Sequence, residues 1–400
     1  MNYYIFENIK DTNFYPISAT RANTDIRIGE KTFLDRIKNL ISSEDKIYLF
    51  VREEIAELTQ ERHPEIDVNP HEVTNGIWLA GNVFWTSDLL KKINQGSESV
   101  WVYENSAVGY NLSRSLGESW LYQGGPVKSE FSEKIEKRNL SCDMVHYVWE
   151  IIDRIPKTLE EEIEKFGPNY KIISDHPTAH IVGGNKIYVN ETSHIEPLVV
   201  LNAEKGPIII MDKVHINSFA YLEGPLYIGN DTVIKPHTHI STSIVGPVCK
   251  LGGEIEKSIF QGNSNKVHDG HLGNTFLGEW VNIGAGTTNS NLKNTYSSVK
   301  VNLGQEEIDT GRCFIGSFIG DHVKIGIGTQ LNTGTVIGPC SNIISNSSSP
   351  KYFEPFSWYV EGNLASYRFE DFIDTAKRVM HRRGMKLSSK EISFYKQLVQ

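Results

Sequence analysis

The sequence has few cysteines and no long apolar run, and both absences restrict the class of protein. The four cysteines of the 400-residue chain lie far apart without a C-x-x-C pair, so we expect reduced thiols and a cytoplasmic protein. Nowhere do about 18 apolar residues follow one another, and the first residues lack the basic and apolar segments of a signal peptide. The sequence therefore predicts neither a membrane-spanning segment nor export.

Positive charge is also scarce. The chain carries 40 Lys and Arg against 49 Asp and Glu, a formal net charge of −9. A general nucleic-acid or anionic-membrane surface is therefore not expected, although a local basic patch remains open. Because 39% of the residues are hydrophobic, the chain can form a core of ordinary size without disulfides. We expect small-molecule partners.

The first 170 residues alternate short apolar runs with amphipathic segments. The runs at 45–51, 76–85 and 99–105 predict strands, and the segments at 31–41, 87–93 and 145–155 predict helices. Alternation of this kind is typical of an α/β, Rossmann-like domain with a mainly parallel sheet. We place this domain at residues 1–170.

A six-residue period replaces this pattern after residue 171. The aliphatic residues in phase are Ile210, Ile216, Leu222, Ile228, Ile234 and Ile240, and again Ile319, Ile325, Leu331, Ile337 and Ile343. Neither a helix nor a strand has that period, whereas each hexapeptide repeat of a parallel β-helix supplies one short strand and one turn. Such repeats usually wind left-handed with three hexads per coil. The sequence predicts a left-handed parallel β-helix over residues 171–349.

Two regions interrupt the period, and a third follows it. Repeats are irregular over 244–277, and residues 284–312 contain no hexad, so we expect them to leave the β-helix as a loop of the kind that often binds ligands. Residues 350–400 predict a C-terminal helical extension with two helices around Gly384. Its basic cluster is either a solvated face or a phosphate site; the members are Lys377, Arg378, His381, Arg382, Arg383 and Lys386.

The segments "GEIEKSIF", "HDGHLGNTFLGEWVNIGAGTTNSNLKN" and "KIGIGTQL" stand in a recognisable order and spacing. They resemble the acetyltransferase half of the bifunctional UDP-N-acetylglucosamine pyrophosphorylase/glucosamine-1-phosphate N-acetyltransferase family, in a divergent form. The resemblance is specific over about 205–345. It implies a homotrimer in which acetyl-CoA and an amino-sugar phosphate meet between neighbouring subunits.

The same resemblance implies a set of site residues. His268 takes the position of the catalytic histidine, and a neutral imidazole suits a general base near pH 7. Lys257 matches the lysine that binds the sugar phosphate, and Asn291 matches the asparagine that contacts the amino sugar; solvated loop residues are the alternative for both. His271 replaces a tyrosine that helps to hold the phosphate, which leaves its role open.

Other positions depart from the family pattern. "HTHISTSIVG" lacks the expected arginine, and Ile327 replaces the expected serine; both losses put the substrate in doubt more than the reaction class. A metal site at His268-x-x-His271 is not expected, because the segment is not helical and no third ligand stands at a suitable spacing. We assign no metal ligand in this chain.

The N-terminal half has a weaker resemblance to sugar nucleotidyltransferases, carried by "FYPISATRANTDIRIGEKTFLDRI" (14–37). Arg21, Arg27 and Lys31 are candidate phosphate contacts, with surface salt bridges as the alternative. The glycine-rich phosphate loop is absent from "FENIKDTN". Asn82 stands where the family has an aspartate that holds Mg²⁺, and a neutral amide is a poor ligand for that ion.

These residues lead to one expected function and two alternatives. We expect an acetyl-CoA-dependent N-acetyltransferase acting on an amino-sugar phosphate, joined to a degenerate nucleotidyltransferase-like domain that could still take Mg²⁺ and a nucleoside triphosphate. The first alternative is an active sugar-1-phosphate nucleotidyltransferase with the β-helix as a trimerisation scaffold. The second is a non-catalytic sugar-nucleotide-binding regulator.

Overall fold

The computed structural model describes residues 1–8, 13–95, 97–163, 170–173, 175–304, 306–345 and 349–399. They form two compact units. The first comprises Met1–Phe14, Arg21–Ile26 and Lys31–Tyr147, and the second comprises Tyr15–Thr20, Arg27–Glu30 and Val148–Gln400. The expected domain boundary at residue 170 adjoins 164–169, which lie outside the described residues.

The first unit contains a seven-stranded sheet in the order β3-β2-β1-β4-β6-β5-β7. β1 pairs in parallel with β2 and β4, β2 with β3, and β5 with β7, whereas β6 is antiparallel to β4 and β5. The mainly parallel sheet expected from the sequence is confirmed. The strands are β1 (Asn2–Phe6), β2 (Lys46–Phe50), β3 (Asp67–Val68), β4 (Gly76–Ala80), β5 (Ser99–Tyr103), β6 (Ser106–Leu112) and β7 (Glu136–Asn139).

Short helices connect these strands. α1 begins with a reciprocal capping box between Thr32 and Asp35, and the Thr86 side chain caps α3, so the first backbone N–H groups of both helices have side-chain partners. The helices are α1 (Phe33–Lys38), α2 (Ala56–Arg62), α3 (Ser87–Ile93), α4 (Arg114–Tyr122) and α5 (Gly125–Lys128).

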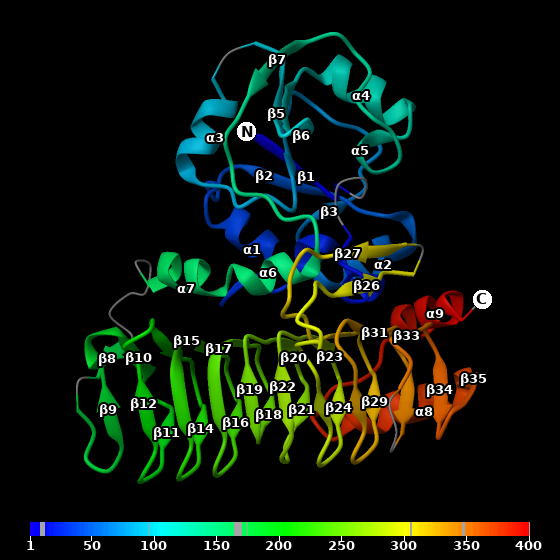
Figure 1. The fold of residues 1–400 in the computed structure, drawn as a ribbon. Coiled ribbons are helices and arrows are strands. Elements are labelled where there is room, and N and C mark those ends of the chain that lie inside the picture. Colours follow the sequence, from blue (N-terminus) through cyan, green and yellow to red (C-terminus); the bar gives the residue numbers. More distant parts are fainter. Residues whose placement is uncertain are drawn as a thin grey trace. The chain divides into compact units, whose positions relative to one another are not determined.

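The second unit is a parallel β-helix of the left-handed type (Figure 1). All eleven in-phase aliphatic residues lie in one core cluster, each at most 3% exposed. One wall is an in-register ladder in which His215 pairs with Val233, 18 positions on, as three hexads per coil require. Its strands are β11 (His194–Ile195), β14 (His215–Ile216), β16 (Val233–Ile234), β18 (Lys250–Leu251), β21 (Asn265–Lys266), β24 (Asn282–Ile283), β29 (Lys324–Ile325), β32 (Asn342–Ile344), β34 (Ser357–Val360) and β35 (Asn363–Ser366).

The other walls form a branched fourteen-stranded sheet. Its order is β33-β31-β28-β23-β20-β17-β15-β13-β10-β8, with β9, β12, β19 and β22 off this path. The strands are β8 (Tyr170–Ile172), β9 (His180–Val182), β10 (Ile187–Asn190), β12 (Val200–Asn202), β13 (Ile208–Ile210), β15 (Tyr221–Ile228), β17 (His239–Val245), β19 (Glu254–Glu256), β20 (Ile259–Gly262), β22 (His271–Gly273), β23 (Phe276–Glu279), β28 (Ser317–Ile319), β31 (Thr335–Ile337) and β33 (Tyr352–Phe353).

An excursion leaves the β-helix later than the sequence predicts. The chain was expected to depart at Gly284, but β25 (Thr288–Asn289) still pairs with β30 (Gln330–Leu331) as part of a coil. A bridge between Leu292 and Phe314 closes the base of the excursion. Beyond it, β26 (Lys300–Asn302) and β27 (Glu307–Asp309) form an antiparallel hairpin, drawn yellow and standing off the ladder in Figure 1.

Among the described residues, the second unit contains four α-helices. α6 (Val148–Asp153) and α7 (Ile155–Ile163) run along the β-helix. The ring of Trp149 on α6 packs against that of Phe318 on β28, with 6.0 Å between the ring centroids. The two expected C-terminal helices are α8 (Phe369–His381) and α9 (Ser389–Leu398). They begin later than residue 350 because the ladder continues through β35. No helix among the described residues is both long enough and apolar enough to cross a bilayer.

Candidate functional site

Two neighbouring strands of the β-helix, β19 and β22, together with the corners next to them, contain three of the four residues predicted for the acetyltransferase site: Lys257, His268 and His271. They pair in parallel, with Glu254 opposite His271 and Glu256 opposite Gly273. The His271 Nδ1 atom lies 3.8 Å from Glu254 Oε2. Because the pairing is in register, the outward side chains of one coil lie directly beside those of the next coil, on one face of the β-helix.

His271 and Asn291 converge over Gly273. A Cβ atom added at Gly273 would lie 2.6 Å from Asn291 Nδ2 and 2.7 Å from His271 Nε2, so only a glycine leaves room for both side chains. The neighbouring Asn289 is buried and holds this strand from behind: its Oδ1 accepts the Gly273 N–H at 2.8 Å and its Nδ2 donates to the Gly273 carbonyl at 2.9 Å. Two of the sequence-predicted residues are thus brought together.

Lys257 stands at the corner that follows β19. Asn274 occupies the corresponding corner after β22, and both have left-handed backbones, with φ of 43° and 50°. Asn274 Oδ1 accepts a hydrogen bond from Asn291 Nδ2 at 2.9 Å. The Lys257 ammonium is exposed and makes no hydrogen bond with the described residues, so it is available to an anionic ligand next to the Asn274–Asn291 pair.

His268 lies in the corner that precedes β22. Its side chain is exposed, and its imidazole makes no hydrogen bond with the described part of the chain. The backbone of this corner, by contrast, is held from inside, because the carbonyl of His268 accepts a hydrogen bond from Lys266 Nζ at 2.9 Å. The ring is therefore free to reach a ligand while its backbone is fixed.

Lys266 is a residue that the sequence interpretation missed. It is 1% exposed and occupies an inward position of the ladder, with Leu251 and Ile283 as its register partners. Its Nζ donates to the carbonyls of Gly252 and His268, both at 2.9 Å, and of Asp269 at 3.3 Å. Burial lowers the pKa of Lys266 to about 8. A lysine in an aliphatic column, within the irregular stretch 244–277, was the available signal.

The candidate phosphate contacts of the N-terminal half are scattered. Arg27 belongs to the second unit, where its Nε donates to the Gln261 carbonyl at 3.0 Å and its Nη1 to the carbonyls of Gly29 and Glu30. Arg21 and Lys31 belong to the first unit, with Arg21 only 3% exposed. The guanidinium of Arg27 is thus occupied by backbone carbonyls.

The carboxyl end of β1 carries a buried carboxylate instead of a glycine loop. Glu7 is fully buried; Oε1 accepts the Asn23 N–H at 2.7 Å, and Oε2 accepts the Arg52 N–H at 2.8 Å. Arg52 Nε lies 3.3 Å from the same carboxylate. Burial raises the pKa of Glu7 above its usual range. The carboxylate thus takes the hydrogen bonds of two backbone N–H groups and the charge of the Arg52 guanidinium, which are the kinds of group that bind phosphate. Part of the segment "FENIKDTN", residues 9–12, lies outside the described residues.

Asn82 follows β4 and is 1% exposed. Its Nδ2 donates to the Val145 carbonyl at 2.9 Å, and its Oδ1 is buried without a hydrogen-bond partner in the described chain. One neutral amide oxygen does not provide the anionic ligand that Mg²⁺ prefers. The residues at this point do not fit the ion.

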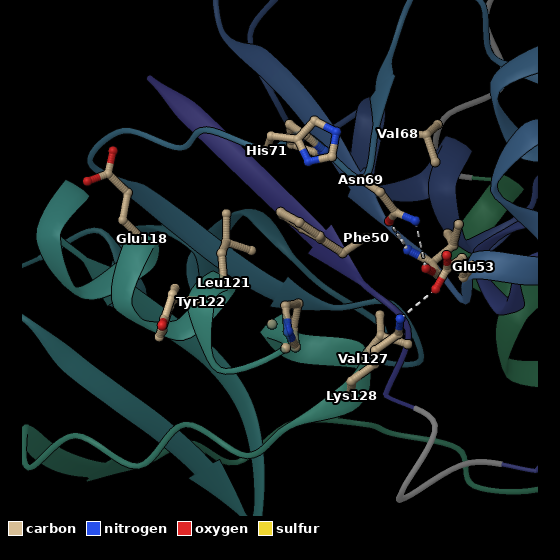
Figure 2. A pocket seen from close by; sticks show the side chains of 15 residues that line it. Phe50, Glu53, Val68, Asn69, His71, Glu118, Leu121, Tyr122, Val127 and Lys128 are labelled. Atoms are coloured by element: carbon tan, nitrogen blue, oxygen red, sulfur yellow. Dashed lines mark hydrogen bonds and ion pairs between the residues drawn. The ribbon is translucent and has the colours of Figure 1, made fainter.

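A pocket of about 750 Å³ lies in the first unit beyond the carboxyl ends of β2 and β3 (Figure 2). Phe50, His71 and Tyr122 are among the rings that line it. Asn69 holds its floor by bonding both the N–H and the carbonyl of Val51, at 2.8 and 3.0 Å, and an ion pair between Glu53 and Lys128 lies on one side. Ligands of open α/β sheets bind beyond the carboxyl ends of the strands.

The chain is similar to known proteins over most of its length. Residues 3–168 match the family model described as sugar nucleotidyl transferase. Bifunctional GlmU proteins of Methanococcus vannielii and Methanococcus maripaludis are 26% and 25% identical over 87% and 92% of this chain and over 94% and 98% of their own length. Over most of its length the chain is thus similar to bifunctional GlmU proteins. A bifunctional sugar-1-phosphate nucleotidylyltransferase/acetyltransferase of Sulfurisphaera tokodaii is 33% identical over 40% of each chain.

Coverage of these GlmU-like relatives is uneven. The chain spans 40% of the length of the Sulfurisphaera protein and 59% of a GlmU protein of Wigglesworthia glossinidia brevipalpis, to which it is 25% identical over 70% of its own length. A solved structure of AntD, an N-acyltransferase from Bacillus cereus, covers 56% of this chain and 97% of AntD at 13% identity and a TM-score of 0.22.

Proposed function

We propose that the protein transfers an acetyl group from acetyl-CoA to the amine of an amino-sugar phosphate on the β19–β22 face of the β-helix. The observation that carries the proposal is the convergence of His271 and Asn291 over Gly273, on the coil whose preceding corner exposes His268. The similarity to bifunctional GlmU proteins over most of the chain supports the same reaction class.

Each residue of this face has a role in the proposed reaction. The neutral imidazole of His268 removes a proton from the substrate ammonium, so that the amine becomes nucleophilic. Lys257 binds the sugar phosphate as a fixed cation, and Asn291, held by Asn274, hydrogen-bonds the sugar. His271 fills the wall between them. Acetyl-CoA, when bound, would supply the acetyl group as a thioester: the amine forms the C–N bond, the C–S bond breaks, and coenzyme A leaves as the thiol with the proton that His268 removed.

The coils beyond β22 offer residues that fit the long arm of acetyl-CoA. Ile327 is 72% exposed at the corner Gly326–Gly328, and Gly286 is exposed at the neighbouring corner Gly284–Gly286. A Cβ added at Gly286 would meet only Gly328, at 3.8 Å. An exposed apolar side chain beside an open glycine corner suits the methylene groups of that arm.

The test is a screen of acetyl-CoA consumption against a panel of amino sugars and their 1-phosphates, with free thiol as the readout. We expect turnover with at least one amino-sugar phosphate and weaker turnover with the same sugar lacking phosphate, because Lys257 would lose its partner. His268→Ala protein, purified in parallel, controls for a contaminating acetyltransferase. Absence of turnover across the panel by a folded protein would overturn the proposal.

A second candidate function rests on the pocket of the first unit. Its position beyond β2 and β3, and its aromatic lining, favour binding of a nucleoside or sugar nucleotide. The buried Glu7 carboxylate and the amide of Asn82 argue against nucleotidyl transfer in that unit. Calorimetric titration with UDP-sugars would test binding, and Tyr122→Ala, at a side chain exposed in the pocket wall, should weaken it. Unchanged affinity in that variant would contradict the assignment.

A further inference from the structure

Three potential metal ligands lie together on the first two coils of the β-helix, away from β19 and β22. His194 and His215 are register partners on β11 and β14, with ring centroids 5.0 Å apart. Glu196 follows two residues after His194, on the same outward side because side chains alternate along a strand. The ligand atoms of all three lie within 4.8 Å of one another.

The Glu196 carboxylate is held in place by its neighbours. Oε1 accepts hydrogen bonds from His215 Nε2 and Asn217 Nδ2, both at 2.8 Å, and Oε2 accepts from Ser218 N and Oγ at 2.9 and 3.1 Å. These four hydrogen bonds fix the orientation of the carboxylate beside the two rings.

We propose that His194, Glu196 and His215 bind a divalent transition-metal ion, with Zn²⁺ the best match. Two imidazole nitrogens and one carboxylate oxygen form a three-ligand zinc set that leaves a fourth position for water. The ion replaces the proton that His215 Nε2 shares with Glu196 Oε1. Asn217 and Ser218 remain as hydrogen-bond donors to the carboxylate, and such outer partners orient metal ligands.

The site would join the terminal strand of the ladder to its neighbour. β11 is the last strand at that end of the ten-stranded sheet, and its pairing with β14 covers two residues. Two ligands come from the first coil and one from the second, so the ion ties the edge strand to the rest of the β-helix. The inference does not depend on the proposed acetyl transfer, because no residue is shared between the two sites.

The experiment is a calorimetric titration of the full chain, free of any histidine tag, with Zn²⁺ at pH 7.5. We expect one ion per chain with micromolar affinity and a higher Tm when the ion is bound. Co²⁺ as a probe should give the visible absorption of a four-coordinate ion with nitrogen and oxygen ligands.

His194→Asn is the decisive variant, because the His194 ring is exposed and makes no hydrogen bond with the described residues, so its loss leaves the fold intact. It should weaken Zn²⁺ binding about 100-fold, as should His215→Asn. His239→Asn is the matched control: His239 is exposed on β17, and its register partners are Tyr221 and Glu254 instead of a second histidine. Wild-type protein that binds no Zn²⁺ at micromolar concentration, or His194→Asn protein that binds as wild type does, would overturn the proposal; either result would leave Glu196 as a brace of the corner.

Discussion

At the scale of single residues, the exposed ring of His268 is the group on which the proposed reaction depends. Removal of a general base typically costs about 10²- to 10⁴-fold in rate, so His268→Ala should lower kcat by that order, measured as thiol release on a substrate of the wild type. Its side chain makes no hydrogen bond in the described chain, so Tm should not change. His271→Ala is the control. If it lowers kcat as much as His268→Ala does, the assignment of the general base to His268 is contradicted.

Lys257 is expected to act on binding. A fixed cation contacts the substrate phosphate equally in the ground state and the transition state, so Lys257→Ala should raise KM for the sugar phosphate and leave kcat nearly unchanged. Steady-state kinetics separate the two. Lys250→Ala, at an exposed lysine of the preceding strand β18, serves as the matched control for loss of one positive charge. A fall in kcat without a rise in KM would contradict the assigned role.

Lys266 is expected to lower the stability of the folded chain and to raise kcat. Its pKa is lowered from 10.5 to about 8 by burial, so the charged form is less favourable in the folded than in the unfolded chain. Below about pH 8 the lysine is charged in both states, and the free-energy cost of burying its charge is fully present. Between about pH 8 and 10.5 the unfolded state binds more protons than the folded state, so the free energy of unfolding rises with pH until this cost has disappeared. Lys266→Met should therefore raise Tm at pH 7, by an amount that shrinks towards pH 10.5.

The same variant should lower kcat, because the corner of His268 loses the donor that holds its carbonyl. In the wild type, kcat should fall above about pH 8 as Nζ loses a proton, and Lys266→Met should lack that alkaline limb. Thermal unfolding and pH–rate profiles of both proteins provide the check. A variant with lower Tm and an unchanged pH profile would make Lys266 a structural residue only.

At the scale of elements, the ends of β1 and β4 determine what the first unit can catalyse. Asn82→Asp restores the missing carboxylate, but it places an anion against the Val145 carbonyl that Asn82 Nδ2 now contacts, while Glu7 still occupies the end of β1. We expect no measurable pyrophosphate release from UTP and a sugar-1-phosphate with Mg²⁺, in wild type or variant, and a lower Tm in the variant. Robust release by the wild type would establish the nucleotidyltransferase alternative.

The sequence predicts elements well where one side-chain type repeats. The hexads located the β-helix because eleven inward positions in phase are aliphatic, and the alternation of strands and helices located the first sheet. The start of the excursion was predicted too early because the inward residue of β25 is Asn289, opposite Leu331, and not an aliphatic residue. Lys266 was missed for the same reason. Both polar residues lie in the core column beside the candidate site, where they hold Gly273 and the His268 corner.

At the scale of the whole molecule, we expect a homotrimer. Several corners of the β-helix expose apolar side chains, among them Leu198, Phe219 and Ile327 at 59%, 52% and 72%, and burial of such side chains drives association. Closed cyclic symmetry is the usual result. Light scattering should give a mass three times the 45.2 kDa of the chain. A stable 45.2 kDa particle at micromolar concentration would contradict the prediction.

The excursion between β25 and β28 bears on how proteins of this kind diversify. Asn282 and Lys324 are register partners although they lie 42 positions apart, whereas Lys324 and Asn342 lie 18 apart. An insertion at a corner therefore changes no strand pairing, and the excursion is closed at its base by a bridge of its own. Mutations that lengthen, shorten or replace this segment therefore leave the pairing of the coils unchanged, so they are not removed by selection for correct folding. The base of the excursion carries Asn291, which the proposed reaction places against the sugar, so under that proposal the sugar that is acetylated can change by insertion and deletion while the core column stays constant.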